Sequence, residues 1–457
     1  MTVTATTADA TDAPRPTTPA TLTQLFFGAV EYYDRPNALQ VKVGGAYQPI
    51  SHRTLAERVR HVALGLRTLD LPADAPVAIL SENRPEWAIV DYGCLTGRVT
   101  SVPLYPTLPA EQMAFILRDS GAAALFVSTA EQVEKIASVR ATLPALTHVI
   151  AFTDTLPEGA DLTLSALEAR GAAAETPDGA ARHRAAALAV SPGDLATIIY
   201  TSGTTGDPKG AMLTHGNIAS NIAAVTSAIP MDEHDVSLSF LPLSHILERM
   251  FDFLMFALGV SIAYAESIDT VVGNLQDVKP TIVVSVPRVY EKIYARVLEN
   301  ALAGGALKKR IFFWARAVGV RWAKATLDGR RPGALPGIQY AIAQRLVFSK
   351  LRARVGGRLR YFVSGGAPLA EEINLFFYAA GLMILEGYGL TETSPVIAVN
   401  TPEHFRIGTV GWPIANVEVK IAADGEILTR GPNVMKGYYK QPDATREAID
   451  EHGWLHP

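Results

Sequence analysis

The chain has 457 residues, of which 48% are hydrophobic and 19% are charged, as in folded proteins and unlike disordered ones. Its net charge of -4 gives no general positive field, which argues against a nucleic-acid partner. The only cysteine, Cys94, excludes an internal disulfide and suits a reducing compartment such as the cytoplasm.

The first part of the chain predicts a tail and an α/β subdomain. Residues 1–20 are rich in Thr, Ala and Pro and lack the basic and apolar regions of a secretory signal, so we expect a disordered tail. Over 21–194, short apolar segments alternate with helical patterns, which predicts a parallel sheet covered by helices. The strands are expected at 77–80, 99–104, 123–128 and 148–152, with helices at 85–97 and 110–119. The Ala-, Pro- and Gly-rich stretch 170–194 is expected to be a linker or the seam between two subdomains.

A second series of strands and helices predicts another α/β subdomain over 195–394, with an inserted helical unit at 289–354. The apolar run 253–265 is shorter than the ~20 residues of a membrane-spanning helix, so we expect a buried helix that leads into a strand. Over 395–457, alternating residues around an Asp-Gly pair predict a hairpin in a small antiparallel β unit. The predicted fold class is therefore α/β, with two helix-covered, mostly parallel sheets and a small antiparallel unit.

The segment "YTSGTTGDPKG", residues 200–210, has the composition of a phosphate-binding loop. Backbone N–H groups in a glycine-rich turn can surround an anion, hydroxyl groups add donors, and Lys209 adds a positive charge. The spacing excludes a Walker A loop, because Lys209 follows Pro208 and no Ser or Thr stands next to it. The alternative is a mobile surface loop without a ligand.

Two further glycine turns follow predicted strands, "VSGGAPL" at 363–369 and "EGYGLTET" at 386–393. The second begins like a dinucleotide-binding fingerprint, but Glu392 occupies the third glycine position. In this turn Tyr388 can lie against a base, Thr391 can donate to a phosphate, and Glu392 can bind Mg²⁺, which prefers oxygen ligands. Three such turns at strand ends predict a nucleotide site in the crevice of an open α/β sheet.

These segments resemble those of the adenylate-forming acyl-CoA synthetases, the AMP-binding superfamily. "YTSGTTGDPKG" is similar to the phosphate loop of that family, and "GGAPL" and "GYGLTET" are similar to its adenylate-binding loops. "LPLSHILER" resembles the segment beside the reacting carboxylate, and "GEILTRGPNVMKGYYKQPDATREAI" the stretch that leads to the hinge. "SVPRVYEKIYARV" and "LVFSKLRARVGGRLRYFVSGGAPL" resemble the long-chain fatty acid branch. The resemblance extends from about residue 20 to the end.

The resemblance implies ATP-dependent activation of a long-chain fatty acid through an acyl-adenylate to acyl-CoA, with Mg²⁺ as cofactor and coenzyme A as co-substrate. It implies that Lys209, His245, Thr391 and Glu392 are catalytic, and that Thr201 and Glu392 bind the metal. The implied nucleotide-binding residues are Thr201, Ser202, Gly203, Thr204, Thr205, Gly206, Lys209, Gly366, Ala367, Gly387, Tyr388, Gly389 and Thr391. The alternative for His245, which the resemblance places near the acyl carboxylate, is an ordinary core histidine.

Other functions stay open. The acyl acceptor can be a carrier protein instead of coenzyme A, or the chain can bind nucleotide and acyl group without catalysis. Family members continue after Trp-Leu-His with Thr-Gly-Asp, a hinge and a C-terminal lid domain, whereas this sequence ends at Pro457, so we expect the lid to be absent. The apolar segment "FDFLMFALG" after His245 is expected to help form an acyl tunnel, or to be plain core.

The segment 306–327 resembles a helix that can lie on a membrane surface. It places Ile311, Trp314, Val318 and Trp322 on one helical face and basic residues on another, a pattern that is compatible with peripheral contact with the inner membrane face. The alternative is a helix that packs its apolar face on the domain. The oligomeric state is left open by the sequence.

Overall fold

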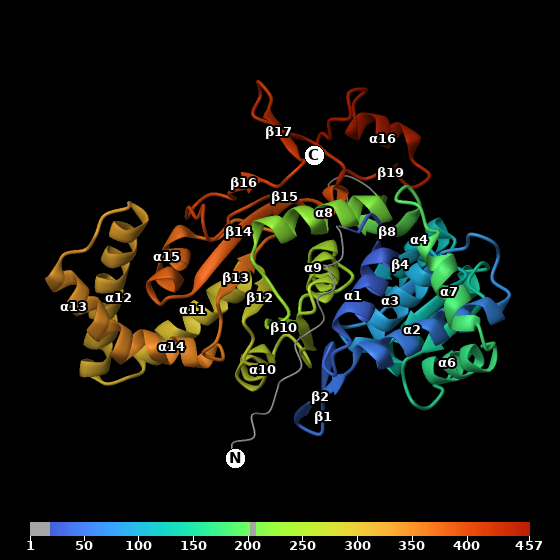
Figure 1. Cartoon of the computed structure of the whole chain (residues 1–457), viewed down its shortest axis with the longest axis horizontal. Coiled ribbons are helices and arrows are strands. Elements are labelled where there is room, and N and C mark those ends of the chain that lie inside the picture. Colours follow the sequence, from blue (N-terminus) through green and yellow to red (C-terminus); the bar gives the residue numbers. More distant parts are fainter. Residues whose placement is uncertain (1–18, 202–206) are drawn as a thin grey trace, which may run out of the picture.

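The structure, a computed structural model, describes residues 19–201 and 207–457. Most of the predicted tail and residues 202–206 of the glycine-rich loop lie outside this part of the chain. Figure 1 shows two sheets with helices packed around and between them, a helical unit at one end, and a small C-terminal β unit beside the edges of both sheets. The predicted fold class is confirmed.

The first sheet has eight strands in the order β19-β9-β8-β4-β3-β5-β6-β7. Its strands are β3 (Val77–Leu80), β4 (Ser101–Leu104), β5 (Ala124–Val127), β6 (His148–Ala151), β7 (Leu162–Thr163), β8 (Leu195–Thr201), β9 (Lys209–Thr214) and β19 (Gly437–Tyr438). Strands β3 to β8 pair in parallel, whereas β9 pairs antiparallel with β8 and β19. Every residue of β3, β4 and β5 is buried, as expected for parallel strands covered on both faces.

The second sheet has nine strands in the order β16-β15-β14-β13-β12-β10-β11-β1-β2. Its strands are β1 (Leu39–Val43), β2 (Ala46–Ile50), β10 (Val236–Ser239), β11 (Ser261–Tyr264), β12 (Ile282–Ser285), β13 (Tyr361–Ser364), β14 (Met383–Gly389), β15 (Val396–Val399) and β16 (Trp412–Pro413). The strands from β1 through β11, β10, β12 and β13 to β14 are parallel, and β2, β15 and β16 extend the sheet antiparallel at its two ends.

The α-helices outside the inserted helical unit are α1 (Leu22–Tyr33), α2 (His52–Leu66), α3 (Pro85–Gly97), α4 (Ala110–Ser120), α5 (Ala130–Ala137), α6 (Leu164–Ala173), α7 (Gly179–Leu188), α8 (His215–Ala228), α9 (Ile246–Ala257), α10 (Val271–Val278), α15 (Glu371–Ala379) and α16 (Pro442–Ala448). Helix α3 has the bounds that the sequence predicts, because Pro85 suits the first turn of a helix.

Two parts of the chain differ from the predicted division. The stretch 170–194 is not only a linker, since it contains the end of α6 and the whole of α7, whose His183 packs edge-on against Phe27 of α1. The chain also crosses between the sheets more than a division at residue 194 implies. Strands β1 and β2 precede that point yet belong to the second sheet, and β8, β9 and β19 follow it yet belong to the first.

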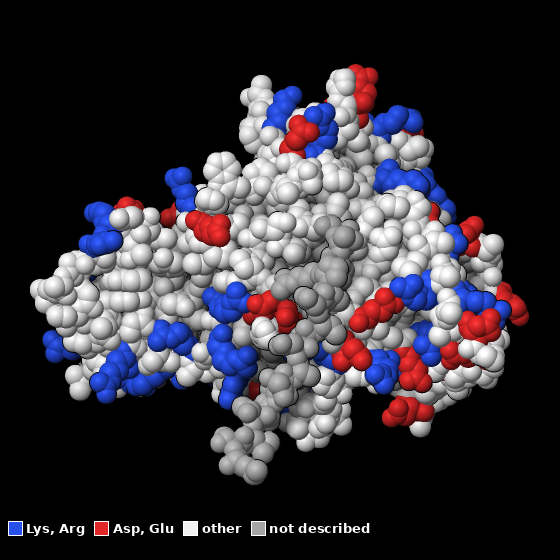
Figure 2. Space-filling model, in the orientation of Figure 1, with Lys and Arg blue, Asp and Glu red and all other residues white. Residues whose placement is uncertain are grey.

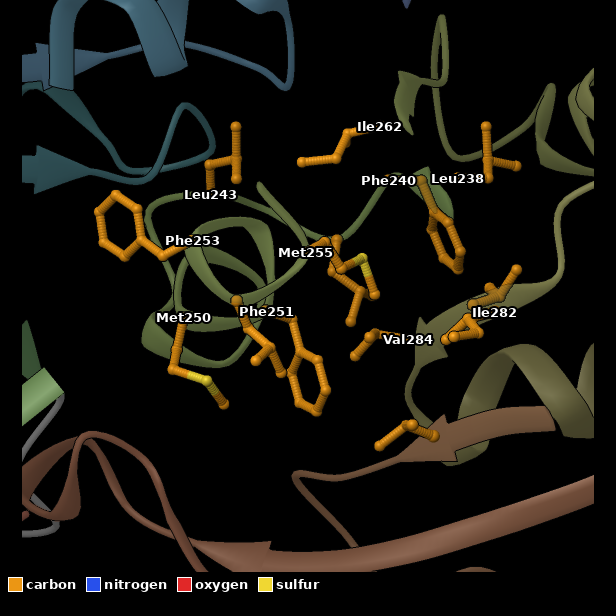
Figure 3. Packing of buried hydrophobic residues seen from close by; sticks show 14 of the residues in the cluster. Leu238, Phe240, Leu243, Met250, Phe251, Phe253, Met255, Ile262, Ile282 and Val284 are labelled. Atoms are coloured by element: carbon orange, nitrogen blue, oxygen red, sulfur yellow. The ribbon is translucent and has the colours of Figure 1, made fainter. Parts of the chain in front are cut away.

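Helix α9 lies in the core between the two sheets. The predicted buried helix that leads into a strand is confirmed, since α9 is followed by β11. Figure 3 shows Phe251 and Met255 of α9 among side chains from β10, β11 and β12, such as Leu238, Ile262 and Val284. These side chains are at most 2% exposed, so each contributes on the order of 1.5–3 kcal/mol of burial.

A buried ion pair also fixes α9 to the first sheet. The Arg249 guanidinium donates from Nε to Asp91 Oδ2 at 2.8 Å and from Nη2 to Asp91 Oδ1 at 2.5 Å. It also donates to Thr197 Oγ1 of β8 and to Ser101 Oγ of β4, each at 2.8 Å. Both side chains of the pair are 1% exposed. Arg249 therefore connects α9 with α3, β4 and β8 at once.

The predicted helical insertion is present as a separate unit at one end of the molecule (Figure 1). It consists of α11 (Pro287–Leu302), α12 (Ala306–Leu327), α13 (Ala334–Ala343), a π-helical turn at Gln344–Phe348 and α14 (Ser349–Arg354). On the face shown in Figure 2, Lys and Arg predominate among the charged side chains along the lower edge of this unit. None of the described helices is long and apolar enough to cross a membrane.

The apolar face predicted to meet a membrane is largely covered inside this unit. Val318 is 3% exposed, and the ring of Trp322 stacks on Tyr340 of α13 with the centroids 3.9 Å apart. Helix α13 therefore covers part of this face, as expected from the alternative in which the apolar face packs on the domain. Trp314 of the same face and the neighbouring Phe313 remain exposed, each by 37%.

The C-terminal β unit contains the predicted hairpin. Strands β17 (Glu418–Ile421) and β18 (Ile427–Arg430) pair antiparallel, and the turn between them includes Gly425 with a φ of +94°. The chain then returns to the first sheet as β19 and continues into α16. This return places the last part of the chain beside the glycine turns.

Candidate functional site

A cavity of about 850 Å³ lies where the ends of β8, β13 and β14 meet the C-terminal unit. Most of the predicted site residues that the structure describes line it, namely Thr201, Lys209, His245, Gly366, Gly387, Tyr388, Gly389, Thr391 and Glu392. Ala367 is exposed next to Gly366 but is not part of the lining. The predicted residues 202–206 lie outside the described residues, between Thr201 and Asp207, which both line the cavity.

The glycines of two turns are required by the backbone. Gly366 has a φ of +82°, a backbone conformation that residues other than glycine rarely adopt. A Cβ atom on Gly389 would lie 1.9 Å from the carbonyl oxygen of Pro395, because β14 and β15 approach closely at an irregularity in their pairing. At the ends of β13 and β14 the local backbone therefore requires glycine at two positions that line the cavity.

Glu386, at 7% exposure, holds these two turns together. Its Oε2 accepts from the backbone N–H of Leu369 at 3.3 Å, and its Oε1 accepts from Asn374 Nδ2 at 2.9 Å. Burial raises the pKa of this carboxyl above its ordinary value, while the two hydrogen bonds act in the opposite direction. Glu386 thus fixes the turn after β13 relative to β14.

Two buried asparagines hold the segment that carries Thr391 and Glu392. Asn221 of α8 donates to the carbonyl oxygens of Thr393 and Val396 at 3.3 and 2.7 Å. Asn433 of the C-terminal unit donates to the same two oxygens at 3.0 and 3.1 Å. The segment is therefore fixed from both sides by side chains that lie more than 30 residues away in the sequence.

Glu392 faces the cavity beside Lys209, and Tyr438 of β19 lies between them. The Tyr438 hydroxyl donates to Glu392 Oε1 at 2.9 Å, and Lys209 Nζ lies 5.2 Å from the centroid of the Tyr438 ring. The pKa of the Tyr438 hydroxyl is raised, first by burial and then by the charge of Glu392. The tyrosine thus stays a hydrogen-bond donor that orients the carboxylate.

His245 lies at the N-terminus of α9 and is exposed to the cavity, so it is not a core histidine. Its Nδ1 accepts from the backbone N–H of Leu247 at 3.1 Å. Removal from bulk water lowers the pKa of the imidazole below its ordinary value, so the ring is neutral at pH 7. With Nδ1 as acceptor, the proton of the neutral ring is on Nε2, which is then available as a donor.

The residues around Glu392 fit a magnesium ion that is shared with a phosphate group. The Glu392 carboxylate and the Thr201 hydroxyl both line the cavity. No group of three or more His, Cys, Asp or Glu side chains able to hold a metal occurs in the part of the chain that the structure describes. Mg²⁺ is usually held by one or two carboxylates together with substrate phosphates and water, and such a site needs no cluster of protein ligands.

Sequence reasoning missed the contribution of the C-terminal unit to the lining. Tyr438, Gln441, Glu447 and His456 all line the cavity. The segment "KGYYKQPDAT" that carries the first two has tyrosines next to basic residues, but nothing in its pattern indicates which strand it joins.

Residues 29–439 match the AMP-binding enzyme family. The long-chain-fatty-acid–CoA ligase FadD15 of Mycobacterium bovis is 39% identical over 90% of this chain and 67% of its own length. The peroxisomal long chain acyl-CoA synthetase 6 of Arabidopsis thaliana is 35% identical over 86% of this chain and 57% of its own length. The chain therefore spans about two thirds or less of the length of these relatives.

Solved structures share the fold. The inhibitor-bound N-terminal domain of FACL13 from Mycobacterium tuberculosis superposes with a TM-score of 0.72 at 20% identity, over 96% of this chain and 95% of that domain. The long-chain-fatty-acid–CoA ligase FadD1 from Archaeoglobus fulgidus gives a TM-score of 0.71 at 21% identity, over 96% of this chain and 81% of its own. By the match over residues 29–439, this chain belongs to the AMP-binding enzyme family.

Proposed function

We propose that the protein activates long-chain fatty acids with ATP and transfers the acyl group to coenzyme A. One observation carries the proposal: a single cavity combines the glycine turns, Lys209, Thr391 and Glu392 with an apolar wall. The apolar part of the lining includes Leu247 and Phe251 of α9, next to His245. A nucleotide and an alkyl carboxylate can therefore be held side by side.

The reaction that suits this cavity has two displacements. A carboxylate oxygen of the fatty acid attacks the α-phosphorus of ATP, the new O–P bond gives the acyl-adenylate, and pyrophosphate leaves with the electrons of the broken P–O bond. The thiol of coenzyme A then attacks the acyl carbon, loses its proton, and releases AMP. Neither displacement needs a protein nucleophile, and Cys94 is fully buried with its pKa raised by burial.

The main task of the protein is to bring two anions together. Lys209 and the backbone N–H groups of the glycine turns are proposed to neutralise the phosphates, and Thr391 to donate to the α-phosphate. The Nε2–H of the neutral His245 is suited to donate to the acyl carboxylate. Glu392 and Thr201 would hold Mg²⁺ against the β- and γ-phosphates, where the ion would reduce their negative charge.

The assay that tests this proposal measures pyrophosphate release that depends on palmitate, followed by detection of palmitoyl-CoA after coenzyme A is added. Pyrophosphate release without palmitoyl-CoA would favour a carrier protein as acceptor. If ATP and palmitate bind but no pyrophosphate is released, the chain is a binding protein and the proposed activity is refuted.

Chain length tests the apolar wall separately. Each additional buried CH₂ contributes about 0.8 kcal/mol, so affinity is expected to rise steeply from octanoate to palmitate. The alternative is that Leu247 and Phe251 are only the edge of the core. Equal affinities for the two acids would contradict a tunnel for chains of ~C12 or longer.

We also propose that the helical unit contacts anionic membranes at its periphery. Leu335, Ile338 and Ile342 form an exposed stripe on α13, at 66, 59 and 45% exposure, and Leu307 of α12 is 73% exposed. The segment 306–327 carries six basic residues and no acidic one. Flotation with phosphatidylglycerol vesicles at low salt tests the contact, and a chain that stays unbound would refute it.

A further inference from the structure

A second cavity, of about 410 Å³, lies inside the helical unit between α11, α12, the π-helical turn and α14. It shares no lining residue with the large cavity. The floor is apolar and buried, with Phe312, Phe348 and Phe376 at most 5% exposed. The rings of Phe312 and Phe348 lie 6.3 and 6.1 Å from that of Phe376. Its size is within the range of about 300–1,000 Å³ that is usual for small-molecule sites.

The charged groups of this cavity are all positive. Lys308, Lys350 and Arg354 line it, and no Asp or Glu does. Each of the three is exposed, and none has an ion-pair or hydrogen-bond partner among the described residues. Lys and Arg side chains without an ionic partner are usually just part of a solvated surface. Here, however, Lys308, Lys350 and Arg354 all line the same apolar pocket.

Helix α12 adds to this positive field. Leu307 and Lys308 are in its first turn, where the backbone N–H groups have no helical carbonyl partner. Gly305 at the N-cap provides no side-chain cap, and the first turn contains no acid. A 22-residue helix with such a start attracts an anion, and the apolar pocket lies next to it.

The mouth of the cavity is apolar as well. Leu307 and Leu346, both part of the lining, are 73 and 44% exposed. Leu346 belongs to the π-helical turn, a rare element that often marks functional sites in helices. Gln344 fixes this turn by donating from Nε2 to the carbonyl oxygen of Ala379 at 2.9 Å. The cavity is thus a formed pocket with an apolar entrance.

We propose that this pocket is a second binding site, for one alkyl chain that is attached to an anionic head group. The chain would occupy the floor between Phe312 and Phe348, and the head would be held by Lys308, Lys350 and Arg354. A free fatty acid and an anionic membrane lipid both have this chemistry. Because the two cavities share no lining residue, the site does not depend on the activity proposed above.

The test is hydrogen–deuterium exchange of the full chain, with and without dodecanoate at submicellar concentration. Protection is expected over 297–312 and 344–354. A variant with Lys308→Glu, Lys350→Glu and Arg354→Glu is expected to bind at least tenfold more weakly at this site. The matched control replaces Lys309, Arg310 and Arg345 by Glu, which changes the net charge equally at exposed residues of α12 and the π-helical turn that do not line the pocket.

A second arm separates the two sources of the ligand. It replaces dodecanoate by phosphatidylglycerol vesicles and follows the same peptides. The site binds the free acid if dodecanoate protects these peptides in the control variant but not in the first variant. It binds a lipid chain if the same difference between the variants is seen only with vesicles. Protection that is absent in both arms, or that both triple variants lose equally, would overturn the proposal. Leu307→Asp, compared with Leu335→Asp, tests the entrance, and equal effects of the two would count against it.

Discussion

The buried pair of Arg249 and Asp91 allows a sharp test of how α9 is held. Replacing Arg249 by Met removes the guanidinium and leaves the Asp91 carboxylate without a charged partner at 1% exposure. Breaking a buried pair in this way is expected to cost roughly 3–5 kcal/mol of unfolding free energy. Asp91→Leu is expected to cost a similar amount, because it leaves the guanidinium unpaired.

The double variant is expected to be more stable than either single one. With both charges removed, no unpaired charge remains, and two apolar side chains of similar length occupy the space. The neighbouring hydroxyl groups keep a partner, since Thr197 Oγ1 also donates to the carbonyl oxygen of Ser101 at 2.8 Å and Ser101 Oγ to that of Ala196 at 3.5 Å. The interaction energy of the cycle is therefore expected to be several kcal/mol, far from additivity.

Urea unfolding followed by circular dichroism gives the four free energies of the cycle. Arg53→Met is the control, because Arg53 pairs with Asp34 at 82 and 56% exposure, where an ion pair contributes little. Losses in the double variant that equal the sum of the two single losses would refute the reasoning. They would mean that the two charges contribute independently.

Other predictions concern the site and the core. Glu392→Gln is expected to weaken binding of Mg·ATP far more than binding of AMP, because AMP lacks the phosphates that would share the metal. Lys209→Ala should act in the same direction but more mildly. Calorimetric titrations that give equal losses of affinity for both nucleotides would contradict the metal assignment. Gly389→Ala is expected to lower the free energy of unfolding by about 1–3 kcal/mol, because the new Cβ would lie 1.9 Å from the Pro395 carbonyl oxygen. Urea unfolding measures this loss, and an unchanged unfolding midpoint would show that the strand pair adapts without cost. Burial raises the pKa of Glu248 from the ordinary 4.5 to about 8. Between these two pH values the folded chain keeps the proton while the unfolded chain loses it, so the free energy of unfolding falls as the pH rises. Glu248→Gln should therefore gain stability relative to the original chain between pH 5 and pH 8, and a pH-independent difference would exclude this titration.

Local elements were predictable where the sequence pattern alone determines them. The strand at 77–80 and the helix at 85–97 have the predicted bounds, because a short apolar run and a proline in the first turn are local signals. The assignment of strands to sheets was not predictable in this way. Whether β1 joins β11, or β19 joins β9, depends on pairing between residues far apart in the sequence.

The same distinction applies to the site and to the helical unit. The glycine turns were found because glycine is required where φ is positive or the backbone approaches closely, as at Gly366 and Gly389. Tyr438 was missed because its role depends on β19 lying next to the first sheet. The apolar face of α12 was correctly seen as apolar, but its periodicity does not tell whether lipid or another helix covers it. In the structure Tyr340 covers Trp322.

The position of α9 links the core to the candidate site. His245 at its N-terminus and Phe251 on its side line the cavity, while Arg249 between them is tied to β8, the strand that ends at Thr201. One helix thus carries part of the apolar wall and is tied to the strand that precedes the candidate phosphate loop. Core substitutions on the buried side of α9, such as Met255→Ala, are therefore expected to weaken the joint binding of nucleotide and fatty acid more than the binding of nucleotide alone. The reason is that, in the proposed site, the nucleotide would contact mainly the glycine turns and Lys209, whereas the acyl chain would contact the helix itself.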